Sequence, residues 1–173
     1  MKVLAISGSL QSRSSNSALI DTATAQHISD IDVQPFARIG ELPHFNPDFD
    51  GDSPPESVLA LRRVARDADA ILIASPEYAH EMPGSLKNAL DWLVPSGDLY
   101  GKPASLLCAS PSAERGKFAR DAVQRTLEAQ GARVVLSNTV VMPRTTDGTV
   151  RVDAAVARVV VRALHALRCA AAE

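Results

Sequence analysis

The chain has 173 residues, of which 46% are hydrophobic and 22% charged, and its formal net charge is −2. This length suits one globular domain, residues 1–173, and the composition excludes disordered and fibrous classes. The small, evenly mixed charge argues against a nucleic-acid partner. Because no stretch reaches the ~20 apolar residues of a membrane span, we expect a cytoplasmic protein without a membrane partner.

In the first half of the chain, runs rich in β-branched residues alternate with stretches of helical periodicity. We predict a strand at 2–7, a helix at 15–28, a strand at 32–37, a helix at 55–67 and a strand at 70–75. The run AILIAS at 70–75 is the clearest strand, because it is apolar without alternation, as expected when both faces of a sheet are covered.

The second half continues the same alternation. We predict a helix at 84–94, a strand at 103–110, a helix at 114–130, a strand at 132–137 and a helix at 153–171. Gly131 is expected to end the helix at 114–130, and Pro35 predicts that the strand 32–37 lies at a sheet edge. The pattern leaves residues 138–152 undecided between a further strand and a loop.

Strands that alternate with helices in this way predict a parallel sheet with helices on both faces. The chain has no G-x-G-x-x-G motif, which favours a flavodoxin-like doubly wound sheet of five strands in the order 2-1-3-4-5. In such sheets the ligand binds beyond the carboxyl ends of the strands, where the order reverses. We therefore expect the loops 8–16, 76–84 and 110–116 to form the site.

The loop GSLQSRSSN at 8–16 joins the first strand to a helix and is rich in hydroxyl and amide side chains. These are Ser9, Gln11, Ser12, Ser14, Ser15 and Asn16. Free N–H groups and the helix dipole favour an anion at this place, so we interpret the loop as a phosphate cradle, although no Walker A motif is present. The alternative is that serine and asparagine only cap the helix, for which one such residue suffices.

The stretch SPEYAHEMPGSLKNALDWL at 75–93 contains a turn bounded by Pro76 and Pro83. Proline favours an extended or turn conformation here. A rigid turn that holds Glu77 and Tyr78 above the crevice presents backbone N–H and C=O groups in fixed positions, which suits the edge of a flat heterocycle.

These two loops resemble the signatures of the NADPH-dependent FMN reductase family, which includes quinone, chromate and azo-dye reductases of the flavodoxin-like fold. The family pattern after the first strand is approximately G-S-L-R-x-x-S-x-N, and this chain matches it at 8–16 except at Gln11. The pattern after the third strand is [ST]-P-E-Y-x-x-x-x-P-G-x-L-K-N-x-[IL]-D-W, which 75–92 match throughout. With length and element order, the resemblance extends over nearly the whole chain.

The resemblance implies FMN as the cofactor, NADPH or NADH as the co-substrate, and a homodimer or homotetramer. It assigns the phosphate of FMN to Ser9, Ser14 and Asn16 of the first loop, with Ser15 as an additional ligand, and Gln11 of the same loop is counted among the cofactor-binding residues. It assigns the isoalloxazine ring to Pro76, Glu77 and Tyr78, with Ser110 on the other side. The helix residues Lys87, Asn88, Asp91 and Trp92 are interpreted as structural or subunit contacts.

The resemblance further implies that FMN carries the chemistry, passing hydride through its N5 atom to a small acceptor such as a quinone, free flavin, azo compound or metal oxyanion. We therefore expect no catalytic side chain. No metal site is expected either, because the two cysteines, Cys108 and Cys169, have no C-x-x-C spacing. Of the four histidines only His80 is placed near the site, where a surface residue is favoured over a proton donor.

Three departures from the family pattern bear on this interpretation. Gln11 replaces an arginine, which removes a bidentate phosphate ligand and should weaken FMN retention; Arg13 is a candidate substitute. The loop SPSAERGKF at 110–118 has one glycine where relatives often have a glycine pair. Ala79 and His80 stand where relatives often carry polar or aromatic groups, so the acceptor pocket need not match theirs.

Two other functions use the same fold. A flavodoxin-type electron carrier is disfavoured, because such carriers are usually strongly acidic and flank the flavin with aromatic residues, which are only 4% of this chain. A member that binds FMN weakly remains open, either as a reductase of free flavin or as a binding module for another phosphorylated ligand, and Gln11 motivates it.

Overall fold

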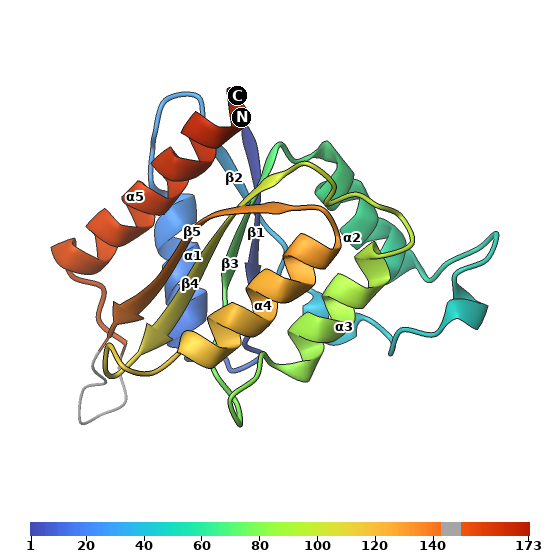
Figure 1. Cartoon of the computed structure of the whole chain (residues 1–173), viewed down its shortest axis with the longest axis horizontal. Helices are drawn as coiled ribbons and strands as arrows, with labels where there is room; N and C mark the ends of the chain where they lie inside the picture. Colours follow the sequence, from blue (N-terminus) through green and yellow to red (C-terminus); the bar gives the residue numbers. More distant parts are fainter. Residues whose placement is uncertain (143–149) are drawn as a thin grey trace.

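The computed structural model describes residues 1–142 and 150–173, in which a central sheet lies between two layers of helices (Figure 1). The strands are β1 (Lys2–Ser7), β2 (Asp32–Pro35), β3 (Ala70–Ala74), β4 (Pro103–Ser110) and β5 (Arg133–Val141). The helices are α1 (Ser15–Ala25), α2 (Glu56–Asp67), α3 (Gly84–Leu93), α4 (Lys117–Ala129) and α5 (Ala154–Ala171). Within the described ranges, no helix is long and apolar enough to cross a membrane.

The sheet is parallel throughout and has the strand order β2-β1-β3-β4-β5. This is the flavodoxin-like, doubly wound order that the sequence predicts. Pro35 lies on the outermost strand, opposite Ala5, which confirms its assignment to a sheet edge. The order reverses between β1 and β3, so the loops that follow these two strands meet at one edge of the sheet.

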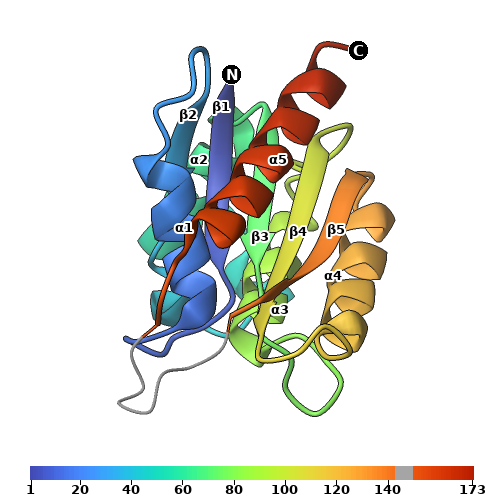
Figure 2. The same cartoon turned by 90° about the vertical axis from the view of Figure 1, so that its left-hand side faces the viewer.

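Each face of the sheet is covered by its own set of helices, as the second view shows (Figure 2). Leu4 and Ile6 of β1 pack with residues of α2, α3 and α4. Val3 and Ala5, which alternate with them along the strand, pack with α1 and α5 instead. Both faces of β1 and β3 are therefore buried, which explains why their sequences are apolar without alternation.

Several boundaries differ from those predicted. α1 ends at Ala25 and β2 at Pro35, both earlier than expected, and α4 begins at Lys117 instead of 114. β5 continues to Val141, beyond the predicted end at 137, because the last residues of β4 pair with it as far as Ser110. Part of the undecided segment is thus strand, and residues 143–149 lie outside the described residues.

The polar residues of α3 that match the family pattern hold a neighbouring loop. Trp92 is fully buried, and its Nε1 donates to the carbonyl of Pro43 at 2.8 Å. Asn88 accepts from the N–H of Phe45 at 2.7 Å and donates to Pro43 at 2.9 Å. The structural interpretation is confirmed for these two residues, because they fasten the 43–45 segment to α3.

A buried ion pair joins the same region to α2. Arg62 donates to both carboxylate oxygens of Asp50, at 2.6 and 2.9 Å. Its Nε and Nη2 also donate to the carbonyl of Trp92, at 3.0 and 2.8 Å. The guanidinium therefore ties the loop before α2 to the end of α3.

Candidate active site

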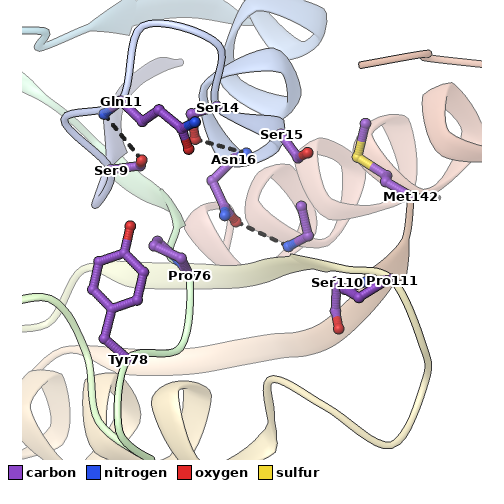
Figure 3. A pocket seen from close by; sticks show the side chains of 11 residues that line it. Ser9, Gln11, Ser14, Ser15, Asn16, Pro76, Tyr78, Ser110, Pro111 and Met142 are labelled. Atoms are coloured by element: carbon purple, nitrogen blue, oxygen red, sulfur yellow. Dashed lines mark hydrogen bonds between the residues drawn. The ribbon is translucent and has the colours of Figure 1, made fainter. Parts of the chain in front are cut away.

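Two adjoining pockets lie at the carboxyl edge of the sheet, where the strand order reverses. The first has a volume of about 240 Å³ and is drawn in Figure 3. Eight predicted site residues line it, namely Ser9, Gln11, Ser14, Ser15, Asn16, Pro76, Tyr78 and Ser110. The second has a volume of about 490 Å³ and extends toward the start of α4. The two pockets share Pro76, Ala109, Ser110 and Pro111 as lining residues.

The first pocket opens onto the start of α1. Ser14 is the N-cap residue, and its Oγ accepts from the N–H groups of Asn16 and Ser17 at 3.2 and 3.3 Å. The capping interpretation is therefore correct for this residue. Ser15 lines the pocket from the first position of the helix. A capped helix N-terminus with further hydroxyl groups around it is suited to an anion.

Asn16 joins the two halves of the first pocket. Its side chain is buried, and Oδ1 accepts from the backbone N–H of Ala109 at 2.9 Å, as the dashed line in Figure 3 shows. β3 ends at Ala74, so at Ala109 the asparagine side chain takes the place of a strand partner. The start of α1 is thereby held to the end of β4.

Tyr78 enters the first pocket from a tight turn after β3. Its N–H donates to the carbonyl of Glu81 at 3.0 Å, and the N–H of Glu81 donates back at 2.9 Å. Ala79 and His80 between them both have positive φ, 50° and 63°. This is the pattern of a two-residue primed turn, although neither residue is glycine. The Tyr78 ring is half-exposed and its hydroxyl points toward the side of Ser9 (Figure 3).

Glu77 does not line the first pocket; the structure places it in the second. Its Oε2 accepts from the N–H of Ala119 at 3.2 Å, in the first turn of α4. The N-cap residue of α4 is Gly116, which has no side chain to do this. Glu77 therefore caps α4 from another loop, and its Oε1 also lies 3.4 Å from Nδ1 of His80.

Cys108 lies beneath the second pocket and is a free, buried thiol. Burial raises the pKa of Cys108 to about 11, with a smaller contribution from the nearby Glu77 carboxylate, against the lowering effect of Arg120. The thiol stays protonated at neutral pH. A nucleophilic or metal-binding role would need the thiolate.

The candidate substitute for the missing family arginine does not reach the site. Arg13 is exposed and is not among the residues that line the first pocket, whereas Gln11 is. Three lining residues were not singled out from the sequence, namely Ala109, Pro111 and Met142, although Pro111 belongs to the expected loop 110–116. Met142 lies in the segment that the sequence pattern left undecided; its N–H donates to the carbonyl of Ser110 at 2.8 Å. The β-branched residues 139–141 just before it were the signal that the last strand is longer than predicted.

Comparison with known proteins finds a matching family. The pattern of the NADPH-dependent FMN reductase family matches residues 1–147. An NAD(P)H-dependent FMN reductase of Pseudomonas aeruginosa is 42% identical over 112 residues, 64% of this chain and 60% of that protein. A 2-hydroxy-1,4-benzoquinone reductase of a Burkholderia species is 39% identical over 116 residues, 65% of this chain and 62% of that protein.

The similarity to one solved structure extends over a longer region of the chain. The flavoenzyme NAD(P)H:(acceptor) oxidoreductase of Paracoccus denitrificans is similar with a TM-score of 0.78 and 27% identity, covering 97% of each chain. The matches to the two curated relatives are shorter and span about three fifths of their lengths, 60% and 62%. Because the family pattern covers well over half of the residues, the chain belongs to the NADPH-dependent FMN reductase family.

Proposed function

We propose that this chain is an FMN-dependent oxidoreductase that takes reducing equivalents from NADPH or NADH and passes them to a small acceptor. The observation that carries the proposal is the continuity of the two pockets through their shared lining residues. One end of this continuous site lies at a helix N-terminus, and the other lies between two loops. A ligand with a phosphate at one end and a flat ring at the other suits that shape.

The residues present fit FMN. No acidic side chain lines the first pocket among the described residues, and the hydroxyl of Ser15 and the start of α1 face it. A phosphate would be held there by neutral donors and the helix dipole. In the second pocket, Pro76 and Pro111 offer rigid walls from opposite loops. When bound, FMN supplies the hydride chemistry, and the chain supplies position and electrostatics.

Acceptors of the proposed enzyme include quinones, free flavin, azo compounds and metal oxyanions. One of the relatives is named as a reductase of 2-hydroxy-1,4-benzoquinone, which supports a small organic acceptor. A homodimer or homotetramer in the cytoplasm is proposed on the family resemblance.

The visible spectrum of the purified protein tests the proposal, followed by anaerobic addition of NADPH with and without added FMN. We expect flavin absorption near ~450 nm that bleaches when NADPH is added. A colourless protein that neither retains FMN nor oxidises NADPH in its presence would contradict the proposal. It would favour the alternative of a module that binds another phosphorylated ligand.

Weak FMN binding is the second candidate. Gln11 favours it, together with the absence of the exposed Arg13 from the residues that line the first pocket. We expect Gln11→Arg to tighten FMN binding by about 10- to 150-fold, since a hydrogen bond to a charged group contributes ~1.5–3 kcal/mol. Quenching of FMN fluorescence measures the dissociation constant. Gln26→Arg is the control, because it adds the same charge after the far end of α1. Equal tightening by both would show that only net charge matters.

Asn16 is expected to act on both stability and FMN affinity. Asn16→Ala leaves the N–H of Ala109 without its partner, at a cost of about 1–3 kcal/mol in the free energy of unfolding. Asn16→Asp keeps the acceptor oxygen but brings a negative charge to the phosphate cradle. We therefore expect the aspartate variant to unfold near the wild-type urea concentration while its FMN affinity falls. Equal stability losses in both variants would contradict the assigned contact.

A further inference from the structure

Two exposed rings meet at the second pocket, and the proposed function does not account for them. His80 comes from the turn after β3, and Phe118 from the first turn of α4. Their ring centroids are 4.5 Å apart with an interplanar angle of 71°, an edge-to-face contact. The His80 side chain is 74% exposed and Phe118 is 52% exposed. Both line the pocket, so a ligand there would meet them.

The pair is held in place from several sides. The backbone of His80 has a φ of 63°, which the two hydrogen bonds of the Tyr78–Glu81 turn impose. Glu77 lies 3.4 Å from the imidazole with one oxygen and caps α4, which carries Phe118, with the other. One carboxylate therefore positions both rings. Rings fixed in advance lose little freedom when a ligand stacks on them.

The charges around the pocket indicate which ligand fits. Its charged lining residues are the carboxylates of Glu77 and Glu114 and the guanidinium of Arg115. Such a lining has no excess of positive charge to concentrate a small oxyanion. Two partly exposed aromatic rings, in contrast, favour a planar aromatic molecule through stacking and edge contacts.

We propose that His80 and Phe118 determine acceptor specificity, by stacking against a flat, uncharged aromatic acceptor in preference to a small anion. This inference rests on the proposed function and narrows its acceptor class. It assigns selectivity to two residues that the family signatures do not fix, since His80 falls on a variable position of the second signature and Phe118 lies beyond it.

The experiment compares menadione, a flat neutral quinone, with ferricyanide, a small anion, on the FMN-loaded protein. Phe118→Ala removes one ring at an exposed position, and His80→Asn removes the other while keeping a residue that tolerates positive φ. Phe49→Ala is the matched control, because Phe49 is 56% exposed and lies elsewhere on the surface. Calorimetric titration of menadione into the oxidised protein, without NADPH, measures binding apart from turnover.

We expect Phe118→Ala and His80→Asn each to weaken menadione binding about fivefold, and to lower the kcat/KM ratio of menadione over ferricyanide to the same degree. Phe49→Ala should leave both quantities unchanged. An unchanged ratio in both ring variants would overturn the inference, as would an FMN affinity that falls as much as menadione binding. If the wild-type protein takes up no FMN, both the proposed function and this inference are contradicted. That failure is detected before any acceptor is added, so it is distinguishable from a failure of this inference alone.

Discussion

Arg62→Ala is expected to destabilise the fold by about 3–5 kcal/mol, the cost of leaving a buried charge without its partner. The Asp50 and Arg62 side chains are each only 11% exposed. Removing the guanidinium also deprives the carbonyl of Trp92 of its two donors. Urea unfolding followed by the fluorescence of Trp92, the single tryptophan of the chain, measures the loss.

Two further variants sharpen this measurement. Arg62→Lys keeps the charge but not the two-pronged contact, so its effect should be intermediate. Arg38→Ala breaks the exposed pair with Glu41, in which the side chains are 53% and 57% exposed, and should cost less than about 1 kcal/mol. If Arg62→Ala lowers the free energy of unfolding no more than Arg38→Ala does, the stabilising role assigned to the Asp50–Arg62 pair is contradicted.

The same pair predicts a dependence of stability on pH. Hydrogen bonds from Arg62 hold the pKa of Asp50 below its ordinary value. A carboxyl group whose pKa is lower in the folded state contributes stability above its unfolded pKa, near ~3.9, and that contribution is lost as pH falls through the folded value. In the Arg62→Ala variant, folding stability should fall less as the pH is lowered, because the pKa of Asp50 is no longer depressed.

Gly116→Ala is expected to cost about 2–5 kcal/mol in the free energy of unfolding, for two separable reasons. Gly116 has a φ of 85°, which costs a residue with a Cβ about 1–2 kcal/mol. A Cβ at this position would also overlap with Sγ of Cys108, and overpacking of this kind costs about 1–3 kcal/mol. Unfolding in urea measures the sum.

A double variant separates the two contributions. Cys108→Ala removes the sulfur atom but keeps its Cβ, which would lie 3.0 Å from the added Cβ. In the double variant most of the steric part should therefore be recovered, and the backbone part should persist. Gly84→Ala is the control, because its Cβ would have nothing within 4 Å and it begins α3. Similar stabilities for Gly116→Ala and Gly84→Ala would show that the loop before α4 shifts without cost.

Local patterns predicted most of the fold and much of the site. The observed strand order was predicted from three features: strands that are apolar without alternation, a proline at an edge strand, and the absence of a dinucleotide-binding motif. The two loops that meet at the reversal of that order supplied seven of the lining residues of the first pocket, and the end of β4 supplied the eighth, Ser110. These features follow from local conformational preference and from periodic burial, which a sequence shows directly.

Contacts between distant residues were not predictable in this way. Asn16 and Ala109 are 93 positions apart, and Glu77 and Ala119 are 42 apart. Nothing in the local pattern around Glu77 shows that α4 begins with a glycine and takes its cap from elsewhere. For the same reason Asn16 was predicted as a phosphate ligand or a helix cap, and its bond to β4 was missed. Such pairs depend on how completed elements pack.

The bond between Asn16 and Ala109 also limits how this site can vary in evolution. Ser15 lines the same pocket, and its side chain makes no hydrogen bond with the described residues, so ligand preference can drift there at little cost to folding. Asn16 is constrained by the strand it completes and, under the proposed function, by the ligand as well. A lineage that changes its phosphorylated ligand would therefore retain this asparagine while the neighbouring hydroxyl groups are exchanged.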